Sequence, residues 1–134
     1  MKVLSVWKAL SKMKVTMVKT DDSIFEDKDC SKAMLLIKDA LEAVEGRWKL
    51  LILYSLCTGP KRFTEIAKEV HGIRDKALAK ELKILQESKL IRRDVYDTFP
   101  PTVEYTITEH GASLRNVLYE LLSWGRTHRK EILG

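Results

Sequence analysis

The chain has 134 residues, of which 45% are hydrophobic and 32% charged, and its formal net charge is +5 at pH 7. This length and balance indicate a soluble protein with one main domain that needs neither disulfides nor a metal ion to fold. No apolar run approaches the roughly 20 residues that a membrane span requires. The N-terminus also lacks the unbroken apolar stretch of a secretory signal, so we expect a cytoplasmic protein.

Motifs for catalysis, metal binding or cofactor binding are missing from the sequence. Cys30 and Cys57 are too far apart for a CxxC motif, and the histidines at 71, 110 and 128 do not have zinc-ligand spacing. The chain contains no phosphate-binding loop, no dinucleotide-binding glycine motif and no serine nucleophile elbow. We therefore expect a protein that is not an enzyme and holds no metal or cofactor.

Residues 1–29 are predicted to form an N-terminal extension, and residues 30–134 the main domain. The extension begins with lysines scattered among apolar residues, which predicts a short amphipathic helix within 1–17. Residues 20–29 are acidic and without periodicity, which is typical of a loop. The apolar face of the expected helix comprises Val3, Leu4, Trp7 and Leu10.

Four helices are predicted at the start of the main domain. The first is amphipathic, with an inner face of Met34, Leu35, Ile37, Leu41 and Val44. The second is almost continuously apolar, so we expect it to be buried on most sides, with Trp48, Tyr54 and the Cys57 thiol in the core. The predicted ranges are 31–45, 47–57, 63–70 and 74–88.

A change of period marks a β-hairpin after these helices. Residues 102–107 alternate between apolar and polar side chains, and residues 90–96 can pair with them antiparallel. The loop 97–101 contains two prolines, which cannot take part in a ladder. A last helix begins near Thr108, a plausible N-cap. The predicted fold is α+β, mostly α: a winged helix-turn-helix with a two-stranded hairpin as the wing and additional N- and C-terminal dimerisation helices.

The helix over 74–88 is predicted to have two faces. Three leucines and three lysines each repeat at i, i+4 and i+7, and the two stripes lie about 200° apart around the helix. Such a lysine stripe is either a solvated charged face or a surface for nucleic acid. Residues 74–93 carry seven basic and three acidic residues, which favours nucleic acid, although Glu81 and Glu87 weaken the field. The stripes are Leu78, Leu82, Leu85 and Lys76, Lys80, Lys83.

Three segments of this sequence, GRWKLLILYSL, TGPKRFTEIAKEVHGI and LAKELKILQESKLIRRDVYDTFPPTVEYTITEHG, closely resemble HxlR-type transcriptional regulators, which are relatives of the MarR group. The resemblance covers about residues 30–127. It implies a winged-helix homodimer that binds operator DNA, with a recognition helix over 74–88 and a wing over 92–102. Double-stranded DNA, in the form of an inverted repeat, is then the expected partner.

The resemblance also implies which residues contact DNA. Arg74 stands where the family commonly has Ser or Thr, so either Asp75 caps the helix or the arginine binds a phosphate. Arg92 and Arg93 point to opposite faces of a strand, so one of them can pair with Asp94 or Glu104. The expected DNA contacts are Lys61, Arg62, Arg74, Lys76, Lys80, Lys83, Arg92, Arg93 and Thr98.

Members of the family often carry a redox-sensing cysteine in the N-terminal part, and Cys30 is the candidate here. The alternative is an incidental surface cysteine. A predicted helix N-terminus lowers the pKa of such a thiol, whereas nearby Asp27 and Asp29 raise it.

The last helix carries more apolar residues than a small core needs, which favours a dimer interface over packing within the chain. An alternative function is a winged-helix protein-interaction module without DNA binding, in which the basic stripe meets an acidic partner. The predicted interface residues are Leu114, Val117, Leu118, Leu121, Leu122 and Trp124.

Overall fold

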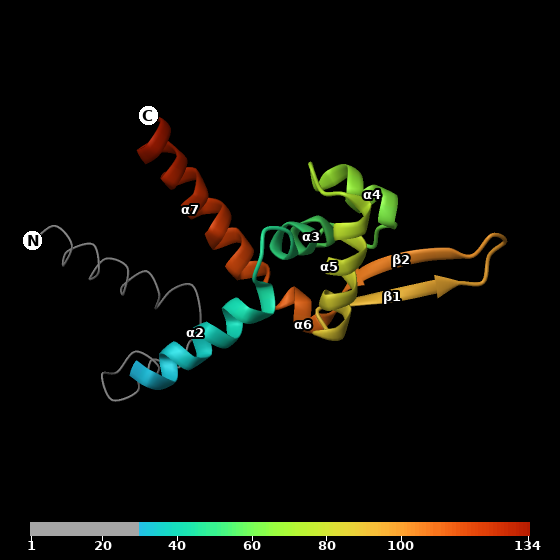
Figure 1. Cartoon of the computed structure of the whole chain (residues 1–134), viewed down its shortest axis with the longest axis horizontal. Coiled ribbons are helices and arrows are strands. Elements are labelled where there is room, and N and C mark those ends of the chain that lie inside the picture. Colours follow the sequence, from blue (N-terminus) through green and yellow to red (C-terminus); the bar gives the residue numbers. More distant parts are fainter. Residues whose placement is uncertain (1–29) are drawn as a thin grey trace, which may run out of the picture. The chain divides into compact units, whose positions relative to one another are not determined.

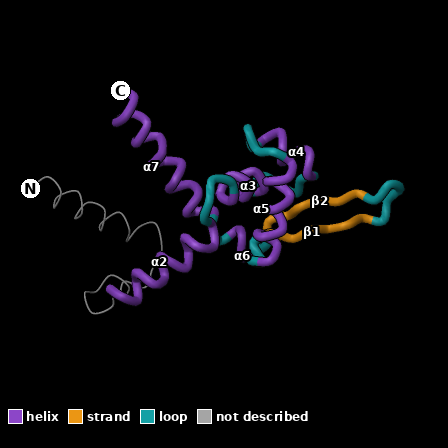
Figure 2. The backbone as a smooth tube through the Cα atoms, viewed as in Figure 1, coloured by secondary structure: helices purple, strands orange, loops and turns teal. Residues whose placement is uncertain are grey.

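The computed structural model describes residues 30–134 (Figures 1 and 2), so the helix and acidic loop expected within residues 1–29 lie outside the described residues. The chain divides into two compact units, residues 1–42 and 43–134. Helix α2 (Cys30–Val44) runs through the described part of the first unit and ends just inside the second. Among the described helices, none is long and apolar enough to cross a membrane.

Helix α2 is amphipathic but buries none of its residues. The sequence predicted an inner face for this helix, yet Met34, Leu35, Ile37 and Leu41 are all more than half exposed. Val44, which is at its C-terminal end and belongs to the second unit, packs against the core of that unit. The periodicity correctly places these side chains on one face, but it does not determine whether the same chain covers that face.

Three further helices form the helix-turn-helix unit. They are α3 (Lys49–Leu56), α4 (Phe63–Glu69) and α5 (Asp75–Glu87), each within two residues of its predicted bounds. The turns between them contain Gly59 and Gly72, whose φ angles of 137° and 87° are strongly unfavourable for residues with a side chain. These glycines let the chain reverse tightly, so that α5 packs beside α3 and α4 (Figure 1).

The wing is an antiparallel hairpin of β1 (Ile91–Tyr96) and β2 (Thr102–Ile107), which pair over their whole length. The prolines lie in the connecting loop, as the sequence predicted. An isolated bridge joins Lys61, just before α4, to Tyr105 of β2. Two backbone hydrogen bonds of 3.0 and 2.7 Å form that bridge, so the base of the wing is fixed to the helix-turn-helix.

The single C-terminal helix predicted from Thr108 is wrong in one respect, because the structure has two helices there. Helix α6 (Glu109–Ala112) is followed by α7 (Arg115–Leu133). Between them, the Leu114 amide donates to the carbonyl of Gly111 at 3.0 Å, which is the tighter i to i−3 pattern. The backbone therefore changes direction at the residue where the apolar stripe begins.

Thr108 is the N-cap of α6, as predicted, and it also ties that helix to the wing. Its hydroxyl oxygen accepts a hydrogen bond from the Gly111 amide at 3.0 Å and donates to the Lys89 carbonyl at 2.7 Å. Gly111 is buried so closely that a Cβ atom there would lie 2.0 Å from the Leu90 carbonyl oxygen. Only glycine fits at this crossing.

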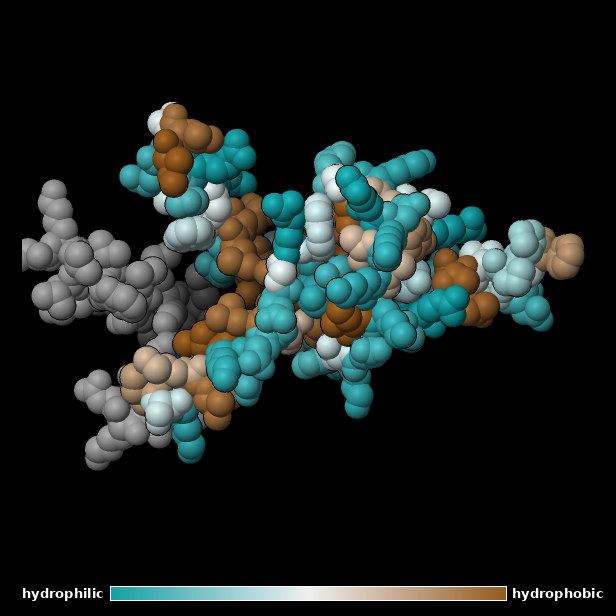
Figure 3. Space-filling view, in the orientation of Figure 1, coloured by the Kyte–Doolittle hydropathy of each residue, from teal (hydrophilic) through white to brown (hydrophobic). Residues whose placement is uncertain are grey.

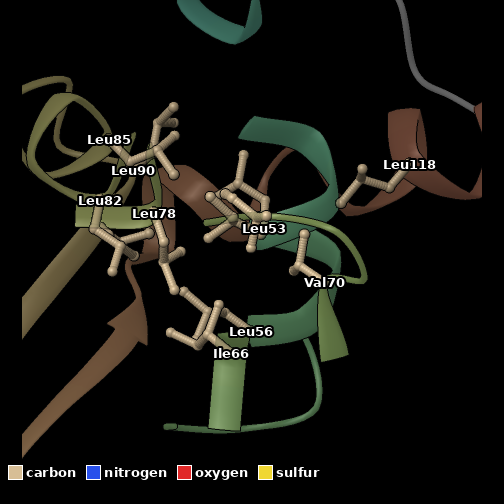
Figure 4. Packing of buried hydrophobic residues seen from close by; sticks show 12 residues of the cluster. Leu53, Leu56, Ile66, Val70, Leu78, Leu82, Leu85, Leu90 and Leu118 are labelled. Carbon is tan, nitrogen blue, oxygen red and sulfur yellow. The ribbon is translucent and has the colours of Figure 1, made fainter. Parts of the chain in front are cut away.

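The core lies where α3, α4, α5, the base of the wing and α7 meet (Figure 4). Trp48 and Cys57 are partly buried against it. Tyr54 was predicted to be a core residue, but it is 46% exposed because α3 is apolar on all sides and the core covers only part of its surface. The buried cluster comprises Ile52, Leu53, Leu56, Ile66, Val70, Ile73, Leu78, Leu82, Leu85, Leu90, Ile91 and Leu118.

Candidate nucleic-acid interface

Helix α5 buries its leucine stripe and exposes its lysine stripe. The side chains of Leu78, Leu82 and Leu85 are at most 1% exposed, while the three lysines on the opposite side lie open to solvent. Arg74 occupies the N-cap position in an extended conformation and makes no side-chain capping bond. Asp75 supplies the negative charge in the first turn. Arg74 is exposed and directly precedes the helix that carries the lysine stripe.

Glu81 does not weaken the positive face of α5, because it points inward. One carboxylate oxygen, Oε2, lies 2.7 Å from Nζ of Lys49 on α3, and the two side chains are 16% and 8% exposed. Oε2 is buried and accepts no hydrogen bond from the described residues, so the ion pair with Lys49 is what compensates its charge. The sequence expectation that Glu81 reduces the outward field is therefore wrong, and the exposed acids of this helix are Asp75 in its first turn and Glu87 at its end.

Lys61, an expected DNA contact, uses its charge within the chain. Its ammonium group lies 2.7 Å from Oε2 of Glu69, and it also donates to Oγ1 of Thr58 at 2.7 Å and to the Ser55 carbonyl. The side chain is 11% exposed. Lys61 therefore joins the end of α3 to α4, whereas Arg62 beside it is exposed at the N-cap of α4.

Glu69 completes this network. Hydrogen bonds from the Lys61 ammonium and from the Ser55 hydroxyl, the latter at 2.6 Å, lower the pKa of Glu69 below its ordinary value of 4.5. Burial acts weakly in the opposite direction. The carboxylate is thus ionised throughout the neutral range and holds Lys61 in place.

The two wing arginines have different surroundings. Nε of Arg92 donates to both carboxylate oxygens of Asp94, at 3.0 and 3.1 Å, so Arg92 is the member of the pair that is ion-paired. Arg93 lies on the other face of β1, the face that Ile91 buries against the core. It makes no ion pair within the described residues.

A groove of about 500 Å³ separates the C-terminal half of α5 from the base of the wing. Lys83 enters it from the helix and Arg93 from the hairpin, so two cations without an acidic partner in the described part of the chain meet there. Gln86 of α5 and Tyr105 of β2 line the same groove. The sequence did not indicate that these two residues lie near Lys83 and Arg93, because they belong to separate elements. The lining residues are Ala79, Lys83, Gln86, Glu87, Arg93 and Tyr105.

The tip of the wing is shaped by its own hydrogen bonds. The Thr98 hydroxyl donates to the Pro100 carbonyl at 2.8 Å and lies 2.8 Å from the hydroxyl of Thr102. The polar group of Thr98, an expected DNA contact, thus has partners inside the loop. Phe99 is fully exposed at the tip, at a position that no pattern in the sequence indicated as functional.

The predicted dimer interface divides into buried and exposed residues. Leu118 is 6% exposed and belongs to the core, and Leu114 packs partly against the same core. The other four predicted residues, Val117, Leu121, Leu122 and Trp124, are exposed, and Trp124 stacks on the imidazole of His128 with ring centroids 4.7 Å apart. Apolar surface along α7 is visible in Figure 3.

A second groove, of about 470 Å³, lies between α3 and α7. Leu121 and Leu122 form one side of it. Leu51 and Tyr54 of α3, which are 49% and 46% exposed, form the other side, although neither was among the predicted interface residues. The exposed apolar surface of α7 therefore continues onto α3.

The cysteines lie in different surroundings. Cys30 is the first residue of α2 and is exposed, whereas Cys57 is partly buried at the end of α3. Both are free thiols. Only Cys30 is fully open to an oxidant dissolved in water.

Comparison with known proteins agrees with this arrangement. A model of the HxlR-like helix-turn-helix family matches residues 43–132. The HTH-type transcriptional regulator YkvN of Bacillus subtilis is 44% identical over 84 residues, which are 63% of this chain and 71% of YkvN. The regulator YtcD of the same organism is 36% identical over 103 residues, or 77% of this chain and 82% of YtcD.

Solved structures show the same fold. The crystal structure of YtcD matches with a TM-score of 0.68 at 38% identity and covers 71% of this chain and 97% of that one. The redox regulator HypR in its reduced form matches with a TM-score of 0.68 at 30% identity, covering 73% of this chain and 96% of HypR. The chain is a helix-turn-helix transcriptional regulator, and it belongs to the HxlR-like family.

Proposed function

We propose that this regulator binds operator DNA as a homodimer, with α5 in the major groove and the wing beside it. The observation that carries the proposal is the exposed lysine stripe of α5, which lies opposite a buried leucine stripe and leads into the groove shared with Arg93. A helix anchored on one side and cationic on the other has the form that docking into a major groove requires.

The groove between α5 and the wing is the natural seat for a backbone phosphate. Lys83 and Arg93 supply two positive charges from opposite sides against the single negative charge of Glu87, and Gln86 and the Tyr105 hydroxyl can donate hydrogen bonds. A phosphate held there would fix how deeply α5 enters the major groove. Base recognition would then fall to the exposed residues nearer the N-terminus of α5, including Lys76 and Lys80.

The exposed part of α7 supports the homodimer. Leu121 and Leu122 continue onto the apolar surface of α3, and a symmetric partner would cover this surface with the same residues. A dimer would place two copies of α5 on one side of the DNA. Two recognition helices about 34 Å apart read successive major grooves, so we expect the operator to be an inverted repeat.

Selection of bound sequences from a random pool of duplex DNA tests this function. We expect an inverted repeat with half-sites one helical turn apart. Affinity for the selected duplex should then fall steeply with salt, by about 0.9 logarithmic units for each phosphate contact per tenfold rise in salt concentration. Lys83→Ala, which removes one of the two cations that line the groove, should flatten this dependence by about one contact.

Lys130→Ala is the matched control, because it removes an exposed lysine from the last turn of α7. It should leave the salt dependence unchanged. Equal slopes for the parent and for variants at Lys76, Lys80 and Lys83 would refute the assignment of α5 as the recognition helix. Failure to bind any duplex would favour the alternative, a winged-helix module that uses its basic face to bind an acidic protein.

We propose further that Cys30 senses thiol oxidants. Its exposure supports this, as do two structural relatives, the redox regulator HypR and YodB of Bacillus subtilis, the latter also solved after diamide treatment. Oxidation would give a mixed disulfide or a bond between two subunits, with diamide taking up the two hydrogen atoms released. Cys30→Ser should keep DNA binding and lose the response to diamide, whereas Cys57→Ser should keep both.

A further inference from the structure

The wing ends in an aromatic side chain that is fully open to solvent. Phe99 is 104% exposed. Its loop is nonetheless held firmly, because the Thr98 amide donates to the Tyr96 carbonyl at 2.8 Å and the Thr98 hydroxyl donates to the Pro100 carbonyl. Pro100 and Pro101 restrict the backbone further. Phe99 is therefore displayed by a loop with a defined shape, at a free end that Figure 3 shows as an apolar spot.

The charges of the wing lie away from this tip. Arg92 and Arg93 are near the base of the hairpin, whereas the loop 97–101 contains no cation and one acid, Asp97. A tip of this composition is poorly suited to bind phosphate, which attracts Lys and Arg. If the wing touches DNA, its tip must meet a part of the duplex that accepts an apolar side chain.

The length of the wing determines which part of the DNA the tip can reach. Each strand has six residues, which span about 20 Å at roughly 3.3 Å per residue. On one side of B-DNA, a minor groove follows a major groove after half a turn, or about 17 Å. A hairpin whose base lies beside α5 therefore reaches the neighbouring minor groove. That groove, about 6 Å wide, admits a hairpin tip but not a helix.

We propose that Phe99 is an apolar wedge that enters the minor groove and partly unstacks one base step. This inference rests on the proposed DNA binding and assigns the tip of the wing a role separate from charge neutralisation. Phe and Pro are among the side chains that architectural proteins insert between base steps, where they kink the duplex. Flexible pyrimidine–purine steps cost least to open, so Phe99 would favour them without reading base edges.

The test uses the full chain and the inverted-repeat duplex selected from the random pool. Each adenine in turn is replaced by 2-aminopurine, whose fluorescence rises when the base is unstacked. The parent protein should brighten a probe about half a turn from the centre of a half-site. Phe99→Ala should abolish that signal and weaken binding by about tenfold or more, since a buried apolar ring is lost. Phe99→Leu should retain most of both.

Controls separate this inference from the proposed function. Tyr96→Ala removes an exposed aromatic ring from the last position of β1 and should leave the signal intact. The salt dependence of binding should be unchanged in Phe99→Ala, because no charge is lost. Two outcomes would overturn the wedge alone. In one, the parent binds the duplex with the expected salt dependence but brightens no probe. In the other, Phe99→Ala brightens the probe as the parent does. A parent that binds no duplex would overturn both proposals.

Discussion

The ammonium group of Lys49 lies 2.7 Å from the carboxylate of Glu81, and this ion pair joins α3 to α5 inside the helix-turn-helix. Lys49 also donates to the Glu45 carbonyl at 3.0 Å, so its position is fixed from both sides. Because Glu81 is held against α3, α5 cannot rotate about its axis without breaking the pair. The pair thus helps to direct the lysine stripe outward.

Breaking this ion pair from one side should be costly. Lys49→Met leaves the Glu81 carboxylate in a largely buried place without a partner, and we expect the free energy of unfolding to fall by about 3 kcal/mol. The double variant Lys49→Met, Glu81→Leu removes both charges and should recover most of that loss. Urea denaturation of the two single variants and the double variant measures the coupling. Strict additivity of the single effects would contradict the interaction.

Gly111 should tolerate no side chain. A Cβ atom at this position would lie 2.0 Å from the Leu90 carbonyl oxygen and 2.8 Å from Cγ1 of Ile107. Gly111→Ala must push α6 away from the base of the wing, and we expect a loss of about 3 kcal/mol in the free energy of unfolding. Thermal and urea denaturation measure it.

The control for that variant is another helical glycine. Gly125 lies within α7 with nothing within 4 Å of its expected Cβ position. Gly125→Ala should therefore stabilise the protein by about 0.5–1 kcal/mol, because alanine favours the helix. Equal effects of the two substitutions would show that the close approach at Gly111 does not limit stability.

Glu69 should make stability depend on pH in the acid range. Its pKa in the folded chain is lowered below 4.5 by hydrogen bonds from Lys61 and Ser55, so folding favours the ionised carboxylate. The stabilisation is complete above the unfolded pKa and is lost as the pH falls through the lower, folded pKa. Glu69→Gln should be less stable than the parent at pH 7, and the difference should shrink below about pH 4.5. If this difference in stability persists unchanged in acid, it arises from packing and not from the charge of Glu69.

The sequence determined the fold well because each element has a strong local pattern. The alternation along β2 and the hydroxyl of Thr108 predicted the wing and the helix cap that follows it. The orientation of Glu81 was also accessible, because on a helical wheel it lies about 40° from Leu85, on the buried side. Its partner Lys49 was not accessible, since the contact depends on how α3 and α5 pack.

The site was less predictable where the chemistry depends on contacts between elements. Lys61 is of a residue type that commonly contacts phosphate. No local pattern shows that Glu69 and the end of α3 surround its ammonium group. Strand alternation predicted that Arg92 and Arg93 face opposite ways. It also places Asp94 on the face of Arg92, which is two residues away. It could not show that the opposite face, with Arg93, lines the groove beside α5, because that depends on how the hairpin packs.

The two wing arginines should contribute differently to DNA binding. Arg93 faces the groove it shares with Lys83, so Arg93→Ala should flatten the plot of log affinity against log salt by about one unit. Arg92 is already neutralised by Asp94, so Arg92→Ala should flatten it less. Titrations of a fluorescent duplex at four salt concentrations measure both slopes. Equal changes would place both guanidinium groups on phosphates.

The proposed dimer predicts different outcomes for neighbouring leucines of α7. Leu121 and Leu122 are 46% and 42% exposed, so replacing both with Glu should leave the monomer folded while like charges meet across the interface. Leu118 is 6% exposed in the core, and Leu118→Glu should instead unfold the chain, because it buries a carboxylate without a partner. Circular dichroism distinguishes the two effects.

Light scattering then tests the interface itself. The parent should have twice the mass of the chain at micromolar concentration, and the Leu121→Glu, Leu122→Glu variant should have the mass of one chain. That variant should also lose binding to an inverted repeat while it keeps weak binding to DNA in general, since its two basic faces no longer act together. Val95→Glu introduces the same charge at an apolar residue of the wing that is 57% exposed, and it should remain dimeric. A parent that is monomeric yet binds the inverted repeat tightly would refute the dimer, because one recognition helix cannot read two half-sites.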